Sequence, residues 1–209
     1  MYREEQFEKP KVAKYHHIIY ISASAIIFIL IIVDLALNRW FSYCWWDFGL
    51  IYAGTFTDFE NLQNENSISD VKSDACGSLK GLIEGSCPDF CDYIDDFQSA
   101  GAVMVFSGIA TLISIAACIF FHFLAFNRSA FRFRVMWVFL IMPTFWYSLG
   151  YVIYLGVGKF GDIKSTSSQR FKSENFEMKE GMILAIVVIS LNVMLMAYSF
   201  IKTKRAFLS

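Results

Sequence analysis

Four long apolar segments constrain this 209-residue chain more than any other feature of its sequence. They cover residues 18–37, 101–126, 135–157 and 181–201, and the last three contain no Asp, Glu, Lys or Arg. An apolar run of about 18 residues or more can cross a bilayer, where its backbone groups must pair within a helix. The sequence therefore predicts an all-α integral membrane protein, with residues 1–209 forming one domain built on a bundle of four transmembrane helices.

Basic residues are unevenly distributed among the segments that join these helices. The N-terminal tail, the turn at 127–134 and the C-terminal tail together hold ten basic and three acidic residues, whereas residues 38–99 hold three basic and eleven acidic ones. Lys and Arg accumulate in the cytoplasmic segments of membrane proteins. We therefore expect both termini on the cytoplasm-like side, with an outer loop at 38–100 and a second outer loop at 158–180.

The first apolar segment has a competing interpretation as a cleaved signal peptide. Such a signal has a shorter apolar region of about 7–15 residues, followed by small residues at the cleavage site. Here the apolar run is longer and ends in Leu37, Asn38, Arg39 and Trp40. We therefore expect the segment to be retained as a transmembrane helix.

The cysteines are concentrated in the acidic outer loop, which contains Cys44, Cys76, Cys87 and Cys91, whereas Cys118 lies in the second apolar segment. An even number of cysteines on the outer side indicates disulfides formed in an oxidising compartment. Four cysteines allow three pairings, and we favour Cys76–Cys87 with Cys44–Cys91. A thiol redox enzyme is the alternative, but Cys87 and Cys91 are one residue too far apart for a Cys-x-x-Cys pair.

Other polar residues give little support to catalysis. The sequence has no Walker loop, Ser-His-Asp set or His-Glu metal helix, so we expect neither an enzyme nor a bound cofactor. His16, His17 and His122 lie near the cytoplasmic ends of the first two predicted helices. They could ligate a haem or a metal, although hydrogen bonding at the membrane surface is the interpretation that we favour. The formal net charge of −1 gives no basic field, so we expect no nucleic-acid partner.

Acidic residues provide two further candidates. Asp34 is the one charged residue inside a predicted span, which is a functional candidate by default. The interpretation that we favour places Asp34 at headgroup level, paired with Arg39. Clustered carboxylates in the outer loop could also gather a cation such as calcium, although a solvated acidic rim is favoured because no EF-hand spacing accompanies Asp89, Asp92, Asp95 and Asp96.

The third predicted helix is unusually rich in large aromatic residues. Some of them are expected at the membrane interfaces, where Trp and Tyr are enriched. We expect the others to form a broad wall that docks against lipid or another membrane protein. The candidate docking residues are Trp137, Trp146, Tyr147, Tyr151 and Tyr154.

The outer loop carries a pattern that resembles the superfamily of claudins, peripheral myelin protein 22 and calcium-channel gamma subunits. The resemblance rests on Trp40 or Trp46, then Gly49-Leu50-Ile51, then Cys76 and Cys87, together with the four-span layout. Ile51 departs from the family pattern, which has Trp at that position. The resemblance implies a left-handed four-helix bundle topped by a small antiparallel β-sheet made from the outer loops.

These features lead to a functional expectation with two alternatives. We expect a non-catalytic accessory or structural subunit in the plasma membrane, which contacts membrane lipid and docks laterally on a larger membrane complex or channel. One alternative is claudin-like cell adhesion or a paracellular barrier. The other is a subunit of a mitochondrial inner-membrane assembly, because the intermembrane space also permits disulfides.

Overall fold

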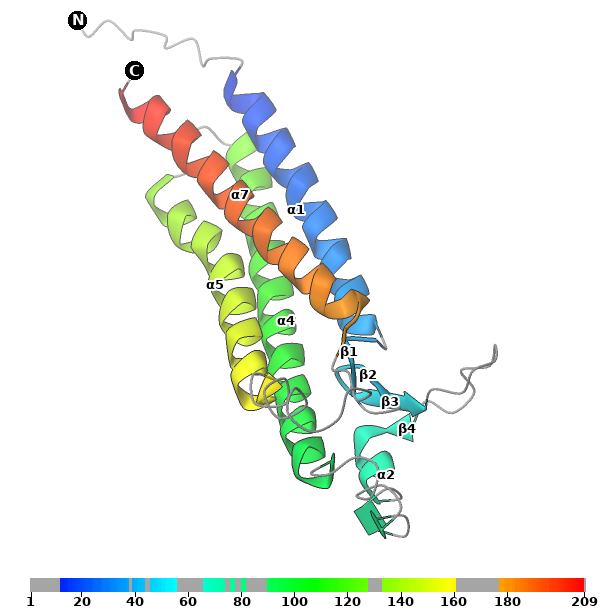
Figure 1. Ribbon diagram of the computed structural model, residues 1–209. Helices are drawn as coiled ribbons and strands as arrows, with labels where there is room; N and C mark the ends of the chain where they lie inside the picture. Colours follow the sequence, from blue (N-terminus) through cyan, green and yellow to red (C-terminus); the bar gives the residue numbers. More distant parts are fainter. Residues whose placement is uncertain are drawn as a thin grey trace, which may run out of the picture.

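The computed structural model describes residues 12–37, 39–43, 46–55, 66–73, 76–77, 80–81, 90–127, 133–160 and 177–208. Within them, long helices lie side by side as a bundle, with a small β-sheet at one end (Figure 1). α1 contacts α4 and α7, and α5 also contacts α4 and α7, so the four helices form a closed ring. Their bounds are α1 (Val12–Ala36), α4 (Phe90–Asn127), α5 (Phe133–Val157) and α7 (Glu180–Leu208).

Three of these helices are long and apolar enough to cross a membrane. The apolar stretches are Tyr15–Ala36 of α1, Phe90–Leu124 of α4 and Glu180–Ile201 of α7, and α5 contains a shorter one, Ile141–Val157. Large apolar side chains also cover the outside of the bundle, and two of them, Phe106 and Ile113, are 67% exposed. An apolar exterior on long helices is the arrangement that lipid stabilises. The structure therefore confirms the expected helical membrane protein.

α4 begins at Phe90, well before the predicted start at residue 101. Its first turns are amphipathic, because Phe90, Ile94 and Phe97 are buried on one face whereas Asp92 and Asp95 are exposed on the other. The acidic residues interrupt the apolar run, so hydropathy alone placed the start of the helix too late. The additional turns extend α4 to the sheet.

The β-sheet combines segments from the two loops that the sequence predicts on the outer side. Its strands are antiparallel in the order β4-β3-β2-β1-β5, and Phe41 on β1 pairs with Phe48 of β2 on one side and with Met178 of β5 on the other. This arrangement confirms the small antiparallel sheet that was expected from the outer loops. The strands are β1 (Phe41–Tyr43), β2 (Trp46–Phe48), β3 (Tyr52–Thr55), β4 (Asn66–Ser67) and β5 (Glu177–Met178).

Gly101 and Gly150 are among the glycines at which chain segments approach too closely for a side chain. A Cβ atom at Gly101 would overlap the backbone carbonyl oxygen of Leu50, in the turn between β2 and β3. A Cβ atom at Gly150 would overlap the side chain of Ser107, between α5 and α4. The turn of the sheet and α5 therefore both rest directly on the backbone of α4 or on its small side chains.

Candidate functional site: the outer platform and the buried polar groups

The sheet, α2 (Ile68–Ser73) and residues 90–98 of α4 form one unit, which we call the outer platform. Its interior contains a cluster of phenylalanine rings. Phe41 lies with its ring centroid 5.0 Å from Phe48, 4.8 Å from Phe97 and 4.9 Å from Phe160. Stacked and edge-to-face pairs at such distances stabilise a core beyond the apolar area that they bury. The cluster therefore joins β1 and β2 to α4 and to the segment after α5.

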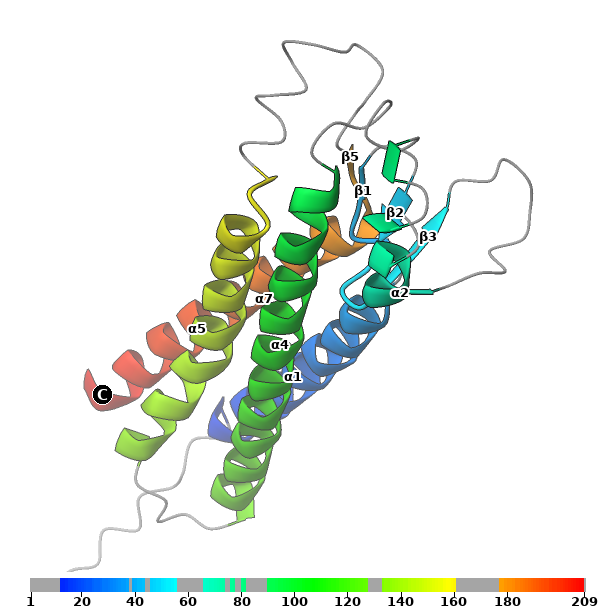
Figure 2. The ribbon, with the colours of Figure 1, turned by 90° about the horizontal axis from the view of Figure 1, so that it is seen from below.

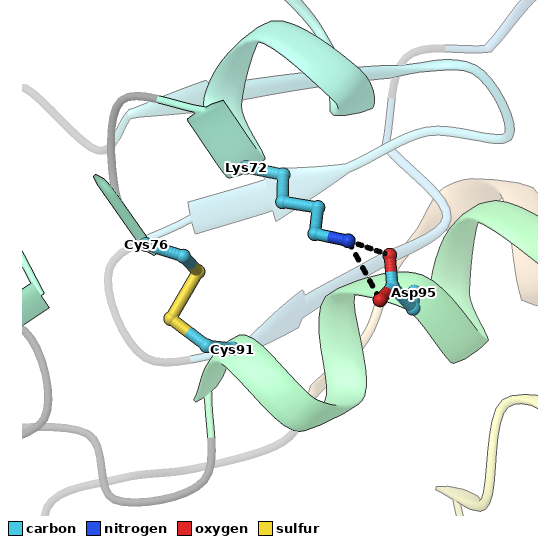
Figure 3. Close-up of polar contacts among 4 residues, drawn as sticks. All are labelled: Lys72, Cys76, Cys91 and Asp95. Carbon is cyan, nitrogen blue, oxygen red and sulfur yellow. Dashed lines mark hydrogen bonds and ion pairs between the residues drawn. A yellow bond between two sulfur atoms is a disulfide. The ribbon is translucent and has the colours of Figure 1, made fainter.

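Two side-chain links attach α2 to α4 (Figure 3). A disulfide joins Cys76, just after α2, to Cys91 in the first turn of α4. Four residues further along α4, Asp95 accepts hydrogen bonds from Lys72 Nζ at 2.5 Å to Oδ1 and 2.7 Å to Oδ2. Residues four apart share one face of a helix, so the covalent and the ionic link lie on the same side of α4.

The structure corrects the predicted disulfide pairing. Cys76 bonds to Cys91 and not to Cys87, so the favoured set of Cys76–Cys87 with Cys44–Cys91 is wrong. The reason is that α4 starts at Phe90 and brings Cys91 to the end of α2, a contact that sequence spacing does not reveal. Cys44 and Cys87 lie outside the described residues.

A second ion pair attaches α4 to the end of α5. Lys159 Nζ lies 2.8 Å from Asp96 Oδ2, so the consecutive acids Asp95 and Asp96 bind lysines from two different elements. Asp92 is exposed, and Asp89 lies outside the described residues. In the part of the chain that the structure describes, no group of three or more His, Cys, Asp or Glu is arranged to hold a metal ion. Two of the four acids proposed for a cation, Asp95 and Asp96, therefore form ion pairs with lysines of the same chain.

Asp34 is fully buried near the outer end of α1. Tyr147 Oη on α5 donates a hydrogen bond to Asp34 Oδ2, and Trp40 Nε1 donates one to the backbone carbonyl oxygen of Asp34 at 3.0 Å. The expected pairing with Arg39 is wrong, because Asp34 faces the bundle interior whereas Arg39 Nε lies 3.5 Å from Asp47 Oδ2 beside the sheet. Asp34 thus connects α1, α5 and the start of the platform.

The aromatic residues of α5 do not form the expected docking wall. Tyr147, Tyr151 and Tyr154 are all buried, and their spacing of four and three residues puts them on one inward face. Trp146 is partly buried, and the side chain of Trp137 lies outside the described residues. Sequence could not make this distinction, because the inward and outward faces of a membrane helix are both apolar. Among the five candidates, Trp146 remains as a described surface residue.

The loop motif proposed from the sequence lies in the platform. Trp40 is fully buried, and its ring packs so tightly on Gly181 at the start of α7 that a Cβ atom there would overlap it. Trp46 is partly buried in β2, and Gly49 and Leu50 form the turn that follows. Of the two candidate tryptophans, Trp40 is therefore the anchor of the sheet on the bundle.

The histidines gather at the other end of the bundle. His17 of α1 and His122 of α4 share a hydrogen bond of 2.9 Å between their Nδ1 atoms, so one ring donates and the other accepts. Tyr20 stacks on His122 with ring centroids 3.9 Å apart, and His16 lies 5.3 Å from the ring of Tyr198 on α7. His17 and His122 are buried, so the expectation that they bond at the membrane surface is wrong. Their imidazoles join two helices instead.

Two apolar grooves lie along α4. The outer groove, about 440 Å³ in volume, lies between the platform and α4 and includes Ile51, Ser69, Gln98, Ala102, Phe106 and Ile109. The inner groove, about 580 Å³, lies between α1 and α4 and includes Ala25, Phe28, Ala116, Phe120 and Phe123. Among the residues that the structure describes, no titratable side chain lines either groove.

Sequence reasoning missed two residues of this region, Lys159 and Phe160, and several contacts of residues that it had named. Lys159 and Phe160 lie two and three residues after the end of the third predicted span. The signal that could have found them is a basic residue followed by an aromatic one at the start of a predicted outer loop. Trp40 follows Asp34 by six residues, which is close enough to suggest a helix end folding back on itself. No pattern pointed to the contact between Tyr147 and Asp34, because the two residues are 113 positions apart.

The contacts described above connect elements of the fold. They comprise a disulfide, ion pairs in or beside the platform and hydrogen bonds inside the bundle. Comparison of the chain with protein-family models, with curated proteins and with solved structures gave no match.

Proposed function

We propose that the protein is a non-catalytic accessory or structural subunit that docks laterally on a larger membrane complex or channel. The observation that carries the proposal is the attachment of the outer platform to every helix of the bundle. The platform is joined to α1 through Trp40 and Asp34, and it continues directly into α4, which contributes residues 90–98. It is joined to α5 through Lys159 and Asp96, and to α7 through β5. A surface held at four points loses little conformational freedom when a partner binds, which favours recognition.

The proposal includes four membrane crossings, with both termini on the cytoplasm-like side. α5 has 25 residues, and at 1.5 Å per residue a helix of this length extends over about 37 Å, more than the hydrocarbon core. The start of α1 and the end of α7 lie at the end of the bundle opposite the sheet (Figure 1). Labelling of C-terminal tags in permeabilised cells alone would support this topology, and labelling in intact cells would contradict it.

The docking face that we propose is the outward side of α5 around Trp146. Phe145 is 51% exposed there, and its ring lies edge-on to Trp146 with centroids 5.7 Å apart. Large aromatic residues are frequent anchors of interfaces, and truncating one of them can cost 2 kcal/mol or more of binding energy. Trp146→Ala is therefore expected to weaken association while the isolated protein keeps its thermal stability.

The experiment is native electrophoresis after extraction in mild detergent, with thermal stability measured on the same preparations. Phe200→Ala, which removes an exposed aromatic ring from α7, is the matched control. Migration of the natural protein only as a monomer would overturn the accessory-subunit proposal. Lost stability with retained association in Trp146→Ala would overturn the docking face alone.

A second candidate function is claudin-like adhesion or a paracellular barrier. The observation that favours it is the five-stranded antiparallel sheet, which takes four strands from the first outer loop and one from the second. The acidic first loop would then select cations at cell contacts. Expression in an epithelial monolayer tests this function, because unchanged cation permeability and no enrichment at contacts would contradict it.

We propose the plasma membrane as the location, because disulfides such as Cys76–Cys91 form in the secretory pathway and persist outside the cell. Surface biotinylation of intact cells with an impermeant reagent is the test. Absence of surface label, together with recovery of the protein in mitochondrial inner membranes, would favour the alternative location.

A further inference from the structure

The outer groove is built by two parts of the molecule that are distant in sequence. Ile51 and Ile68 of the platform form one side, and Ala102, Phe106 and Ile109 of α4 form the other. α2 lies beside α4 at this place (Figure 2), and the two helices are in contact. The groove has a volume of about 440 Å³, which accommodates part of a ligand, and its walls are almost entirely apolar.

The groove crosses the boundary between the polar and apolar parts of α4. Asp96 is the last charged residue of α4 before its apolar stretch, and the groove extends from Gln98 to Ile109. The eleven steps between these two residues extend over about 16 Å of helix, roughly half the thickness of the hydrocarbon core. Polar side chains of Ser67, Ser69 and Gln98 lie at the outer end, and the inner end is wholly apolar. This polarity matches an amphiphile that lies along the membrane normal.

The inner end of the groove is continuous with the lipid-facing surface of α4. Phe106, Ile109 and Ile113 are all exposed along this face of a helix that can cross a membrane. A partner helix would need small residues at its contact to approach closely, and this rim instead carries Phe106, Ile109 and Ile51. A flexible acyl chain can follow such a rim, so lipid is the occupant that the surface favours.

The polar mouth of the groove favours a positively charged headgroup. Ser67 Oγ, at the mouth, donates a hydrogen bond of 2.7 Å to Asp70 Oδ2, which places an exposed carboxylate there. The nearby cation, Lys72, is bound to Asp95. The Asp70 charge therefore attracts a choline ammonium and repels a headgroup that carries only a negative charge.

We propose that the outer groove binds one acyl chain of an outer-leaflet choline lipid, with the choline beside Asp70. The leaflet follows from the proposed orientation of the platform, whereas the site itself needs only a membrane-embedded α4. The inner groove provides the comparison, because its lining of residues such as Ala25, Ala116 and Phe120 has no polar end. Lipid chains in the inner groove have no headgroup contact by which they could be selected.

The experiment uses the full-length protein in nanodiscs of equal parts phosphatidylcholine and phosphatidylglycerol. A trace of either lipid carries a photoreactive diazirine on its acyl chain, and adducts are mapped by mass spectrometry. With the choline probe, adducts should concentrate on Ile51, Phe106 and Ile109. Ala102→Trp, which fills the groove, should lower them at least about fivefold, whereas Ala116→Trp, its counterpart in the inner groove, should leave them unchanged.

The headgroup is tested by Asp70→Asn, with Asp92→Asn as a matched loss of one exposed acid from α4. Asp70→Asn should lower the ratio of choline to glycerol adducts about two- to fivefold, the size expected for one exposed charge contact. Each lipid occupies both leaflets of a nanodisc, so the ratio of adducts does not depend on the orientation of the protein in the membrane. Failure of the site is therefore separable from failure of the topology or of the accessory function.

Several results would overturn the proposal. If both lipids give equal amounts of adduct in the natural protein, the groove has no headgroup preference. If Ala102→Trp leaves the amount of choline-lipid adduct unchanged, the adducts come only from lipid that surrounds the protein unspecifically. If Ala102→Trp loses thermal stability, Ala102→Leu provides a smaller obstruction at the same position. A photoreactive amino acid in place of Ile109, introduced in cells, should capture lipid; capture of a protein chain instead would identify a partner helix as the occupant.

Discussion

The two ends of the helix bundle are held together in different ways. At the outer end, a disulfide and ion pairs connect helices to segments of the loops, as in Cys76–Cys91 and Lys159–Asp96. At the inner end, the polar contacts among the described residues connect helices directly, as between His17 and His122. The outer platform therefore depends on the bundle for its position, whereas the inner contacts depend only on helix packing.

This difference separates two kinds of substitution. A change at the outer end should loosen contacts between loop and helix, and its effect should be visible in the outer platform. A change at the inner end should act on helix association and leave the platform in place. Single substitutions at the outer contacts, each with a matched position of the same chain as its control, separate the two effects.

The largest effect is expected at Gly101, where the turn after β2 touches α4. Gly101→Ala puts a methyl group into the space of the Leu50 carbonyl oxygen, and backbone has to move to accommodate it. Overpacking of this kind should cost about 3 kcal/mol or more of stability. Thermal unfolding of the purified variant measures the loss.

Gly156→Ala is the control for this substitution, because a Cβ atom at Gly156 meets nothing within 4 Å in α5. Alanine is the better helix former, so this variant should be neutral or more stable by up to about 1 kcal/mol. Similar losses in the two variants would show that the contact with Leu50 does not determine the position of the turn.

Removal of the disulfide should have the next largest effect. Cys76→Ser opens a link between residues 15 positions apart, which the entropic model values at about 3 kcal/mol. Peptide mapping without reductant should recover Cys76 joined to Cys91. Because Cys44 and Cys87 are then left to each other, a second link between these two is expected. A peptide that joins Cys76 to Cys87 would contradict the structure.

The sequence predicted the helices well because their signal is local. A run of apolar residues longer than the bilayer requires leaves few alternatives to a helix, and this is independent of what the helix touches. The β-sheet was expected from the resemblance carried by Gly49 and Leu50 in the outer loop. The early start of α4 also has a local signal, because the spacing of Phe90, Ile94 and Phe97 is that of an amphipathic helix. The acidic residues between them obscure this signal in a hydropathy profile.

The candidate site was harder to predict because its contacts join distant parts of the chain. Which cysteine meets Cys76 depends on where α4 begins, and which side of α5 faces inward depends on where the other helices pack. Tyr147 illustrates the second difficulty, because in a helix that is apolar on all sides its hydroxyl group does not indicate which side faces inward. The position of Asp34 on another helix determines which group the buried hydroxyl of this tyrosine contacts.

A smaller effect is expected for the hydrogen bond between Tyr147 and Asp34. Tyr147→Phe removes the donor and leaves a buried carboxyl group without that partner, which should cost about 1–3 kcal/mol. Tyr154→Phe is the matched control, because among the described residues the Tyr154 hydroxyl has no hydrogen-bond partner. Equal thermal stability of the two variants would contradict a structural role for the Asp34 contact.

The smallest effect is expected for the ion pair between Lys72 and Asp95. Both side chains are well exposed, and such pairs contribute about 0–1 kcal/mol, a value that salt screens further. Lys72→Met should therefore change stability little. Lys159→Met should cost more, because the side chain of its partner Asp96 is only 27% exposed, against 57% for Asp95.

The disulfide already holds α2 on α4, so the ion pair between Lys72 and Asp95 should contribute more in a Cys76→Ser background. A double-mutant cycle at low and high salt measures this coupling, and strict additivity of the two substitutions would show that the ionic and covalent links act independently.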